Sequence, residues 1–515
     1  MIGEVEPRPV RPHAAPRIGP ISRRAAGLLL HPTSLPGPFG IGDLGRTAHV
    51  FVDFLASAGI KLWQVLPLGP TGYGDSPYQL FSAFAGNPLL ISLEVLVDDG
   101  LLGREDLASV PSFPAHRVDF GAVIAFKQPL LRRAWERFAG GAAPHLSDEF
   151  KAYRRAHRRW LDDYAFFMAL KDANGGAMWN AWDRPLARRE PQALAKARRA
   201  HAKDIAAHRF RQFLFDRQWS ALREHAHAAG IRIVGDIPIY VAFDSADVWA
   251  HPELYQLGDD FEPTVVAGVP PDYFSATGQL WGNPIYRWDA LEATRFAWWV
   301  ERFRSTLARV DIVRLDHFRG FEAYWEVPAG MPTAERGRWV KAPGDKLLAT
   351  LRRRLGALPV IAEDLGVITP EVIALRDRFK LPGMVILQFA FATDGQDPSL
   401  PHNLPRNRVI YSGTHDNDTT RGWYESSSTE AERTFARRYV ATDGTHIAWD
   451  LIRMAFASVA DTAIVPVQDV LELGTDARMN LPGRPGGNWG WRCPPGALNP
   501  EIAMQLAEWV TFYGR

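Results

Sequence analysis

Eight short apolar runs recur along the chain, and helical patterns precede several of them. The runs are rich in Val, Ile and Leu and lie near residues 28, 63, 234, 312, 361, 386, 410 and 464. Such near-continuous apolar runs are typical of strands covered on both faces of a parallel sheet. Apolar positions at helical spacing predict helices over about 46–58, 208–229, 295–308, 344–355 and 370–380. Eight alternating units predict a closed (β/α)₈ TIM barrel of the α/β class.

The spacing of the strands is uneven, so long insertions must separate some of them. The largest covers about 90–205 and is predicted to be mainly helical, with a basic run that we interpret as a solvated helix face. A second insertion, about 240–293, reads as loop-rich and aromatic. After the eighth strand only about 45 residues remain, enough for one loop and a closing helix at Glu501–Phe512. We therefore expect residues 25–515 to form the barrel, with no C-terminal β-sandwich.

The amino-acid composition limits which partners the protein is expected to bind and in which compartment it is expected to work. Lys and Arg total 59 against 58 Asp and Glu, so neither nucleic acid nor an anionic membrane is an expected partner. The single cysteine, Cys493, excludes an internal disulfide and a cysteine metal cluster and fits a reducing, cytoplasmic location. We expect no membrane span, because no run of about 18 apolar residues is present. Residues 1–24 are rich in Pro and Arg and predict a flexible tail rather than a signal peptide.

The fourth predicted strand, within Val310–Gly320, carries two charges at its C-terminal end. Arg314 and Asp316 are two residues apart and therefore point to the same side of the strand. Each buried charge needs a partner, and the C-terminal ends of barrel strands are the usual place for catalysis. The pair could be a structural ion pair or part of a catalytic site, and this stretch alone does not decide between them.

Three other strand ends add carboxylates to the same predicted rim. Asp236 ends the third strand, Glu363 the fifth and Asp416 the seventh, while Asp364 and Asp418 could be helix N-caps. No H-E-x-x-H zinc motif is present, and no metal is expected at the site. Magnesium with a phosphorylated substrate remains an alternative.

Paired carboxylates for glycoside chemistry fit the pattern better than a metal. Neighbouring strands lie about 4.8 Å apart, so Asp316 and Glu363 could come within the roughly 5 to 5.5 Å of a retaining mechanism. The longer glutamate suits an acid/base and the shorter aspartate a nucleophile. Arg314 would keep Asp316 ionised, and a neighbouring carboxylate would raise the pKa of Glu363.

A glycine-rich stretch at 40–45 matches the dinucleotide pattern G-x-G-x-x-G. A Pro-rich loop separates it from the first strand, and the second strand ends without an acidic residue. A dinucleotide-binding fold requires a direct strand-turn-helix at the glycines and an acidic residue at the end of the second strand, so we interpret the match as fortuitous.

Several longer motifs resemble one family. The chain is similar to the amylomaltase-type 4-α-glucanotransferases, glycoside hydrolase family 77, within the α-amylase clan. The resemblance covers about 27–510 and rests on motifs at residues 72–79, 235–238, 269–274, 280–284, 314–320, 362–366, 414–419 and 478–483. Tyr240-Val241-Ala242 stands where most amylases have a histidine, as expected of amylomaltases.

The resemblance implies a role for each matching position. Asp316 would be the nucleophile, Glu363 the acid/base and Asp416 the carboxylate that binds sugar hydroxyls in the transition state. Substrate-binding roles would fall to residues from the strand ends, an early loop and a late covering loop, namely Arg314, His415, Asp236, Tyr78, Ser76, Trp281 and Asn480. Tyr78, Trp281 and Asn480 could instead be core or turn residues.

The expected function is transfer of α-1,4-glucan segments among maltooligosaccharides, starch or glycogen-derived glucans, with no cofactor. A hydrolase of the same clan is the nearest alternative. A non-catalytic glucan-binding scaffold is a third possibility, but all three carboxylates that such a scaffold could dispense with are present.

Overall fold

A computed structural model describes residues 24–271, 275–484 and 486–515. Its centre is a closed, all-parallel barrel of eight strands in the spatial order β1-β12-β11-β10-β9-β6-β3-β2. The strands are β1 (Ala25–Leu29), β2 (Leu62–Gln64), β3 (Arg232–Ile237), β6 (Ile312–Leu315), β9 (Val360–Ala362), β10 (Gly383–Ile386), β11 (Arg408–Tyr411) and β12 (Thr462–Pro466). They coincide with the eight predicted apolar runs, which confirms the predicted fold class.

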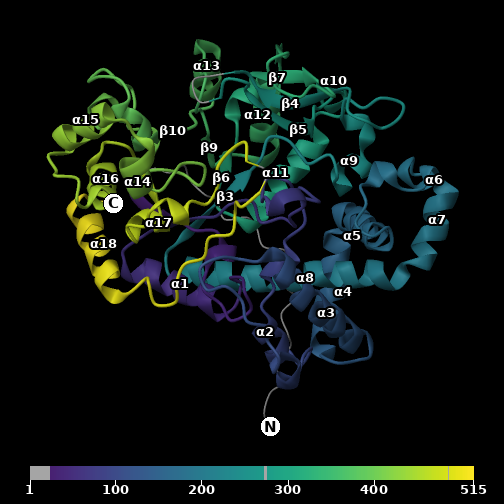
Figure 1. Ribbon diagram of the computed structural model, residues 1–515. Helices are drawn as coiled ribbons and strands as arrows, with labels where there is room; N and C mark the ends of the chain where they lie inside the picture. The colour runs from purple at the N-terminus through teal and green to yellow at the C-terminus, as the bar shows by residue number, and fades with distance from the viewer. Residues whose placement is uncertain (1–23, 272–274, 485) are drawn as a thin grey trace, which may run out of the picture.

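Helices surround the barrel, and every helix predicted from the sequence is present (Figure 1). They include α1 (Arg46–Ser57), α11 (Ala297–Arg309), α12 (Gly344–Leu355), α13 (Pro370–Arg378), α14 (Thr420–Gly422), α15 (Glu430–Val440), α16 (Ile447–Ala457), α17 (Val467–Val470) and α18 (Pro500–Phe512). Gly59 follows α1 with φ of 70°, a left-handed conformation that glycine adopts without steric penalty. Only α17, a loop and α18 follow the last strand, so no β-sandwich is present after β12 in the described residues.

The insertion before β3 is helical, as predicted. It contains α2 (Leu93–Asp98), α3 (Phe120–Ala139), α4 (Ser147–Ala156), α5 (Arg158–Ala173), α6 (Arg184–Ala187) and α7 (Pro191–Ala200). The next helix, α8 (Ala202–Ala228), begins earlier than the predicted residue 208 and joins the insertion to the barrel. Most of the basic run is exposed, although the guanidinium of Arg198 lies over the ring of Phe166 at 4.6 Å.

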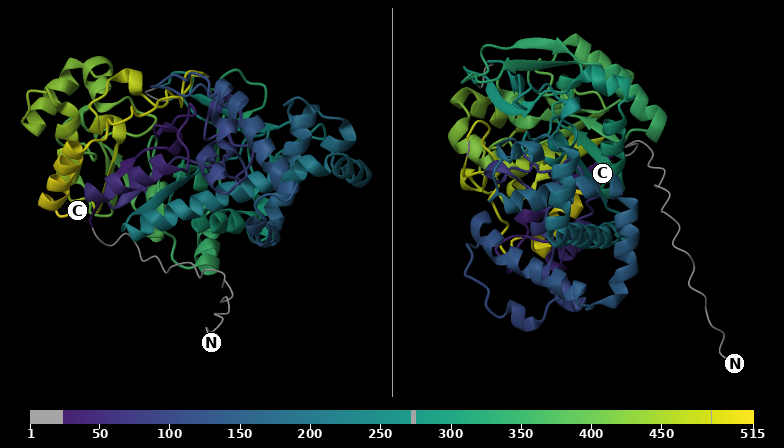
Figure 2. Two further views of the ribbon diagram at one scale, coloured as in Figure 1. Left: turned by 90° about the horizontal axis from the view of Figure 1, so that it is seen from below. Right: turned by 90° about the vertical axis from the view of Figure 1, so that its right-hand side faces the viewer.

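A second sheet was not predicted. The segment expected to be loop-rich contains α9 (Ala246–Ala250), α10 (Trp288–Ala293) and two strands, β4 (Val265–Val269) and β5 (Gln279–Pro284). These strands pair with β7 (Ala323–Pro328) and β8 (Arg338–Lys341) in an antiparallel sheet of order β5-β4-β7-β8. In the right-hand view of Figure 2 this sheet and the helical insertion lie at opposite ends of the molecule.

The two described ends of the chain meet at the C-terminal end of α16. Arg24 donates hydrogen bonds to the carbonyls of Ser458 at 2.7 Å and Phe456 at 2.9 Å, and Arg515 also bonds to the Phe456 carbonyl at 2.7 Å. Arg24, which was counted in the flexible tail, is therefore fixed; residues 1–23 of that prediction lie outside the described residues. Among the helices the structure describes, none combines the length and the apolar character needed to cross a membrane.

Candidate active site

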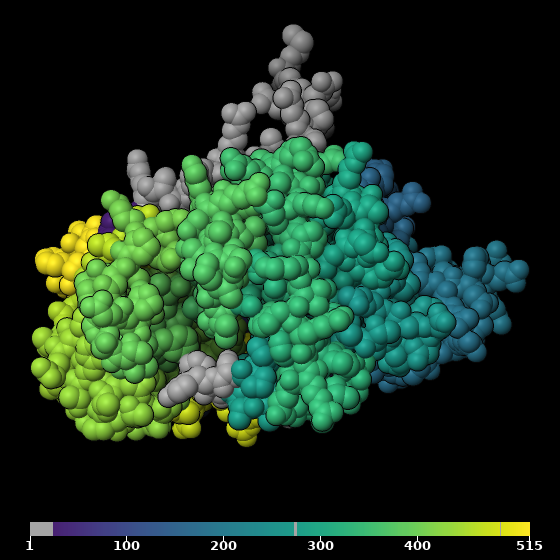
Figure 3. Space-filling view, turned by 90° about the horizontal axis from the view of Figure 1, so that it is seen from above, coloured from purple at the N-terminus to yellow at the C-terminus, as the bar shows by residue number. Residues whose placement is uncertain are grey.

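The C-terminal ends of β3, β6, β9 and β11 bring the predicted polar residues to one mouth of the barrel. Asp236 lies within β3, directly across from Arg314 of β6 in the strand register. Asp316 follows β6, Glu363 follows β9, and Asp416 lies in the loop after β11. Because all eight strands are parallel, these ends share one rim. On a face of the molecule seen in Figure 3, a hollow separates the lime-green side, which includes α15, from the green and teal side.

Arg314 is the electrostatic centre of this mouth. Its side chain is almost fully buried, and its Nη1 donates to Oδ2 of Asp236 at 2.7 Å and to Oδ1 of Asp316 at 2.9 Å. Burial alone would lower the pKa of Arg314, but the two carboxylates outweigh it and hold the pKa well above its usual value. The guanidinium is therefore a permanent positive charge shared by two aspartates.

The two aspartates that share Arg314 differ in exposure. The side chain of Asp236 is fully buried, and burial raises its pKa to about 6 although Arg314 opposes the shift. The side chain of Asp316 is 25% exposed, so it is the carboxylate of the pair that a ligand in the cleft can reach. Both alternatives from the sequence, a structural ion pair and an accessible site residue, are therefore compatible with this arrangement. Arg314 makes ion pairs with both aspartates, and one of them, Asp316, remains accessible.

Glu363 is held by backbone amides and not by a cation. Its Oε2 accepts from the His317 N–H at 2.7 Å and its Oε1 from the Leu365 N–H at 3.0 Å. His317 adopts a left-handed backbone with φ of 49°, uncommon for a residue other than glycine, immediately after Asp316. Burial, reinforced by Asp316, raises the pKa of Glu363 to about 8 against the opposing effect of Arg314. Glu363 therefore carries a proton at neutral pH.

Asp416 has the opposite electrostatic character. The Nδ2 of Asn480 donates to its Oδ1 at 2.6 Å, and the Nε2 of His415 lies 3.3 Å from its Oδ2. Burial alone would raise the pKa of Asp416, but His415, Asn480 and Arg314 outweigh it and hold the pKa well below its usual range. Asp416 is therefore ionised, and its side chain is 43% exposed.

Aromatic residues line the same region. The hydroxyl of Tyr78 donates to Oδ2 of Asp236 at 3.0 Å, and its ring stacks on His415 with centroids 5.2 Å apart. The ring of Trp281, on β5, meets the edge of His317 at 4.8 Å. Ser76 precedes Tyr78 by two residues, and its Oγ accepts a hydrogen bond from the Tyr78 N–H at 3.2 Å.

Two acidic residues of the rim have structural partners, but neither is a helix N-cap. Asp364 forms an ion pair with Arg376 and accepts from the Met384 N–H at 2.7 Å. Asp418 accepts from the Thr475 hydroxyl at 3.0 Å, whereas Thr419 caps α14. The suggestion that they cap helices was therefore wrong.

Two observations concern the alternative sites in the described part of the chain. The glycine stretch at 40–45 is closely packed, since a Cβ added to Gly42 would lie 2.1 Å from the Pro32 carbonyl oxygen. Across residues 24–271, 275–484 and 486–515, no group of three or more His, Cys, Asp or Glu side chains is placed to hold a metal ion.

Residue-level reasoning missed three members of the site. The amide of His317 binds Glu363, and its position directly after Asp316 was the available signal. The ring of Trp489 lies 5.7 Å from that of Tyr78 and 5.9 Å from that of His415. Arg478 donates to the Asp416 carbonyl, and its place two residues before Asn480 was the only signal for it.

Known proteins with the same organisation share most of this sequence. Residues 30–498 match glycoside hydrolase family 77, described as 4-alpha-glucanotransferase. The 4-alpha-glucanotransferase of Thermus thermophilus is 57% identical over 94% of this chain and 97% of its own length. That of Synechocystis is 51% identical over 96% and 99%. The structure of an amylomaltase from Streptococcus agalactiae in complex with acarbose superposes with a TM-score of 0.92 at 40% identity, over 96% of this chain and all of that one.

Proposed function

The chain belongs to glycoside hydrolase family 77, the 4-α-glucanotransferases, and we propose that it works by a retaining double displacement through Asp316. The donor is a maltooligosaccharide or starch chain, and the acceptor is the 4-hydroxyl of another glucan or of glucose. An α-1,4-glucan segment passes between them by way of a covalent glycosyl-aspartate.

The opposite protonation states of Glu363 and Asp416, together with the accessibility of Asp316, carry this proposal. Glu363, with its pKa raised to about 8, starts as an acid, whereas Asp416 starts as an anion. Asp316 is accessible, and its ion pair with Arg314 at 2.9 Å stabilises its negative charge. Carboxyl groups driven apart in protonation state are the usual requirement for separate acid and nucleophile roles.

In the first step, Glu363 donates its proton to the glycosidic oxygen while a carboxylate oxygen of Asp316 attacks the anomeric carbon. The bond between that carbon and the leaving oxygen breaks, and the leaving chain departs with a free 4-hydroxyl. Glu363 is left ionised, and the glycosyl group is bonded to Asp316.

In the second step, the 4-hydroxyl of an acceptor attacks the same carbon from the face that the leaving chain vacated. Glu363 takes the hydroxyl proton, and the bond to Asp316 breaks. Both carboxyl groups return to their starting states, and two inversions retain the α configuration.

The surrounding residues bind the sugar at the cleavage point. Asp416 accepts hydrogen bonds from sugar hydroxyls that tighten as positive charge develops on the ring. Tyr78 and Trp281 offer aromatic faces to sugar rings on the two sides of the cleaved bond. The remaining substrate-binding contacts come from Asp236, Arg314, His415, Ser76 and Asn480.

Transfer requires that an acceptor reach the intermediate before water does. In this proposal the described parts of the segments near 268–283 and 473–492, which leave out residues 272–274 and 485, cover the mouth. The segment at 473–492 contains an internal hydrogen bond, in which the Trp489 N–H donates to the Met479 carbonyl at 2.7 Å. It also places the Trp489 ring beside Tyr78 and His415.

Incubation with maltotriose alone separates transfer from hydrolysis. Transfer yields free glucose together with maltodextrins longer than maltotriose, which chromatography resolves. Glucose and maltose with no longer product would identify a hydrolase of the same clan instead. Asp416→Asn is the matched control, because its loss of both activities would place the reaction at this site.

A further inference from the structure

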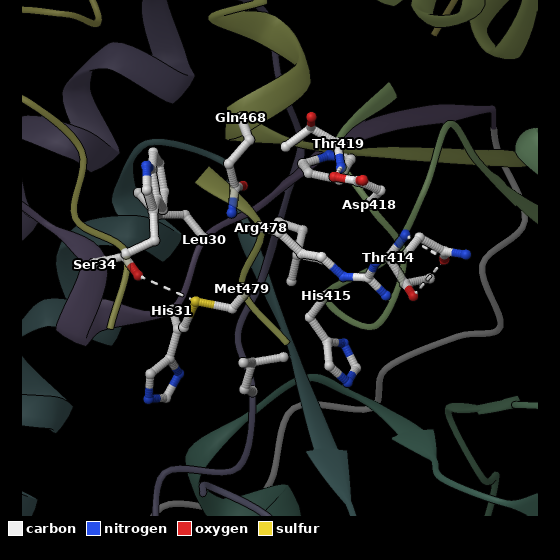
Figure 4. A pocket seen from close by; sticks show the side chains of 15 residues that line it. Leu30, His31, Ser34, Thr414, His415, Asp418, Thr419, Gln468, Arg478 and Met479 are labelled. Carbon is white, nitrogen blue, oxygen red and sulfur yellow. Dashed lines mark hydrogen bonds between the residues drawn. The ribbon is translucent and has the colours of Figure 1, made fainter. Parts of the chain in front are cut away.

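Arg478 lies between the catalytic rim and the segment that covers it, and the reaction steps above leave it without a role. Its side chain is half-buried. Its Nε donates to the Asn480 carbonyl at 2.7 Å, and its Nη2 donates to the Asp416 carbonyl at 2.6 Å. Figure 4 shows the side chain reaching from the Met479 segment toward the loop that carries Thr414 and His415.

The two carbonyls belong to segments that are 64 residues apart in the chain, and both lie at the catalytic carboxylate. Beside them, the Asn480 N–H donates to the His415 carbonyl at 3.0 Å, and the Asn480 amide binds Oδ1 of Asp416 at 2.6 Å. The planar guanidinium fits this arrangement, because two of its N–H groups donate in parallel to two acceptors.

The electrostatic setting keeps Arg478 charged in this position. Burial lowers its pKa from a value far above neutrality, and the nearby Asp418 and Asp416 oppose that change. Hydrogen bonds from a cation to carbonyl oxygens are stronger than neutral ones. Arg478 therefore links the covering segment to the rim through a charge-assisted hydrogen bond to the Asp416 carbonyl.

We propose that Arg478 is a positioning residue that fixes the Asp416 carboxylate, through the Asp416 backbone and through Asn480, in the orientation that binds the transition state. The proposal rests on the role assigned to Asp416 above. It predicts an effect on the chemical step more than on substrate binding, because a long glucan is held by many contacts besides Asp416. Misplacement of a catalytic group by about 1 Å is enough to lower a rate by roughly 100-fold.

Kinetics of Arg478→Ala with maltotriose test the proposal. We expect kcat to fall by about 10- to 100-fold while KM stays within about three-fold. Arg478→Lys should remain impaired, because a single ammonium cannot donate along two parallel directions. The control is Arg354→Ala, which removes an exposed arginine of α12, outside the covering segment, and should leave both constants unchanged.

Chemical rescue distinguishes positioning from a general structural role. The Arg478 side chain borders a cavity of about 20 Å³ that His415 and Met479 also line, so its removal leaves room for a small cation. Millimolar guanidinium chloride should restore part of the kcat of Arg478→Ala and none for Asn480→Ala. Combining the two substitutions should add little to the loss of Asn480→Ala alone, because both act on Asp416.

Three results would overturn the inference: wild-type kcat in Arg478→Ala, full activity in Arg478→Lys, or equal loss in kcat and in folded fraction without rescue. If Arg478→Ala does not fold, Arg478→Lys decides the question by its kcat alone. Asp416→Asn separates this inference from the proposed function. Loss in Asp416→Asn with none in Arg478→Ala refutes only the positioning role, whereas full activity in Asp416→Asn refutes the role of Asp416 itself.

Discussion

An aspartate flanks each end of strand β6, and each forms an ion pair with an arginine, but the two carboxylates differ in their surroundings. Asp311 precedes the strand and forms an ion pair with Arg223, whereas Asp316 follows it and forms one with Arg314. The first lies at the N-terminal face of the barrel and the second at the C-terminal face. In barrels of this kind, the N-terminal face contributes stability and the C-terminal face contributes chemistry.

At the N-terminal end, the protein satisfies Asp311 completely. Its oxygens accept from Arg223 Nη2 at 2.8 Å and from the Ile233 N–H at 2.8 Å, and His227 Nε2 lies 2.9 Å away. Only 2% of the side chain is exposed. Burial alone would raise its pKa, but these donors outweigh it and lower the pKa instead. Nothing of this carboxylate is left for a ligand.

At the C-terminal end, Asp316 shares a single arginine with Asp236 and keeps 25% of its side chain exposed. If Asp316 is the nucleophile that we propose, residue type and ion pairing do not distinguish a structural carboxylate from a reactive one. The number of protein donors around the two oxygens, and access from the cleft, make the distinction.

The largest effect should come from Asp316→Asn. The amide keeps the size of the side chain but is a far weaker nucleophile, so kcat should fall by at least ~1000-fold, or several kcal/mol of transition-state stabilisation. The melting temperature should change little, because Arg314 retains Asp236. Turnover of maltotriose and calorimetry measure the two quantities; activity close to that of the wild type would remove Asp316 from the nucleophile role.

Asp311→Ala should produce the reverse result. It leaves Arg223 and the buried Ile233 N–H without their acceptor, which should lower the free energy of unfolding by about 2 to 4 kcal/mol. For a chain of this length that corresponds to roughly 2 to 4 °C in melting temperature. The kcat per folded molecule should stay within about two-fold of the wild-type value, and a large loss there would break the contrast between the strand ends.

The pH dependence of stability gives this second variant an internal control. The lowered pKa of Asp311 means that its contribution is complete above its unfolded pKa of about 3.9 and is lost as the pH falls toward the folded value. The difference in melting temperature between wild type and Asp311→Ala should therefore shrink below about pH 4. If the difference in melting temperature stays constant through this pH range, the lost stability comes from packing and not from the charge of Asp311.

Sequence patterns predicted the barrel because parallel strands that are buried on both faces consist of nearly continuous apolar residues. The second sheet gave no such signal. Strands β4 and β7 pair although Val265 and Pro328 are far apart in sequence, and both strands mix buried and half-buried positions. Tertiary pairing, and not local pattern, forms this sheet.

The site was predictable to the extent that strand ends were. Alternation placed Arg314 and Asp316 on one side, and neighbouring strands placed Glu363 nearby. The contact between Asn480 and Asp416 spans 64 residues and was not predicted; the family resemblance placed Asn480 only on a loop that covers the site. The same limitation applied to Asp311, because the three donors that make it structural come from α8 and β3.

The last prediction is a loss of activity at alkaline pH that depends on the C-terminal face of the barrel, where Glu363 lies, and not on the N-terminal face. Glu363 must be protonated for the first step, and its raised pKa keeps the proton until the pH passes about 8. Above that value the protonated form is lost, so kcat/KM should fall by about ten-fold per pH unit.

Because Asp311 lies at the other end of the barrel, Asp311→Ala should show the same alkaline limb. Glu363→Gln, assayed with α-glucosyl fluoride, whose leaving group needs no acid, should keep the first step, seen as the initial release of fluoride, and this release should lack the alkaline limb, whereas the second step is slowed because its base is missing. A limb that persists in Glu363→Gln, or that moves in Asp311→Ala, would show that another group controls it.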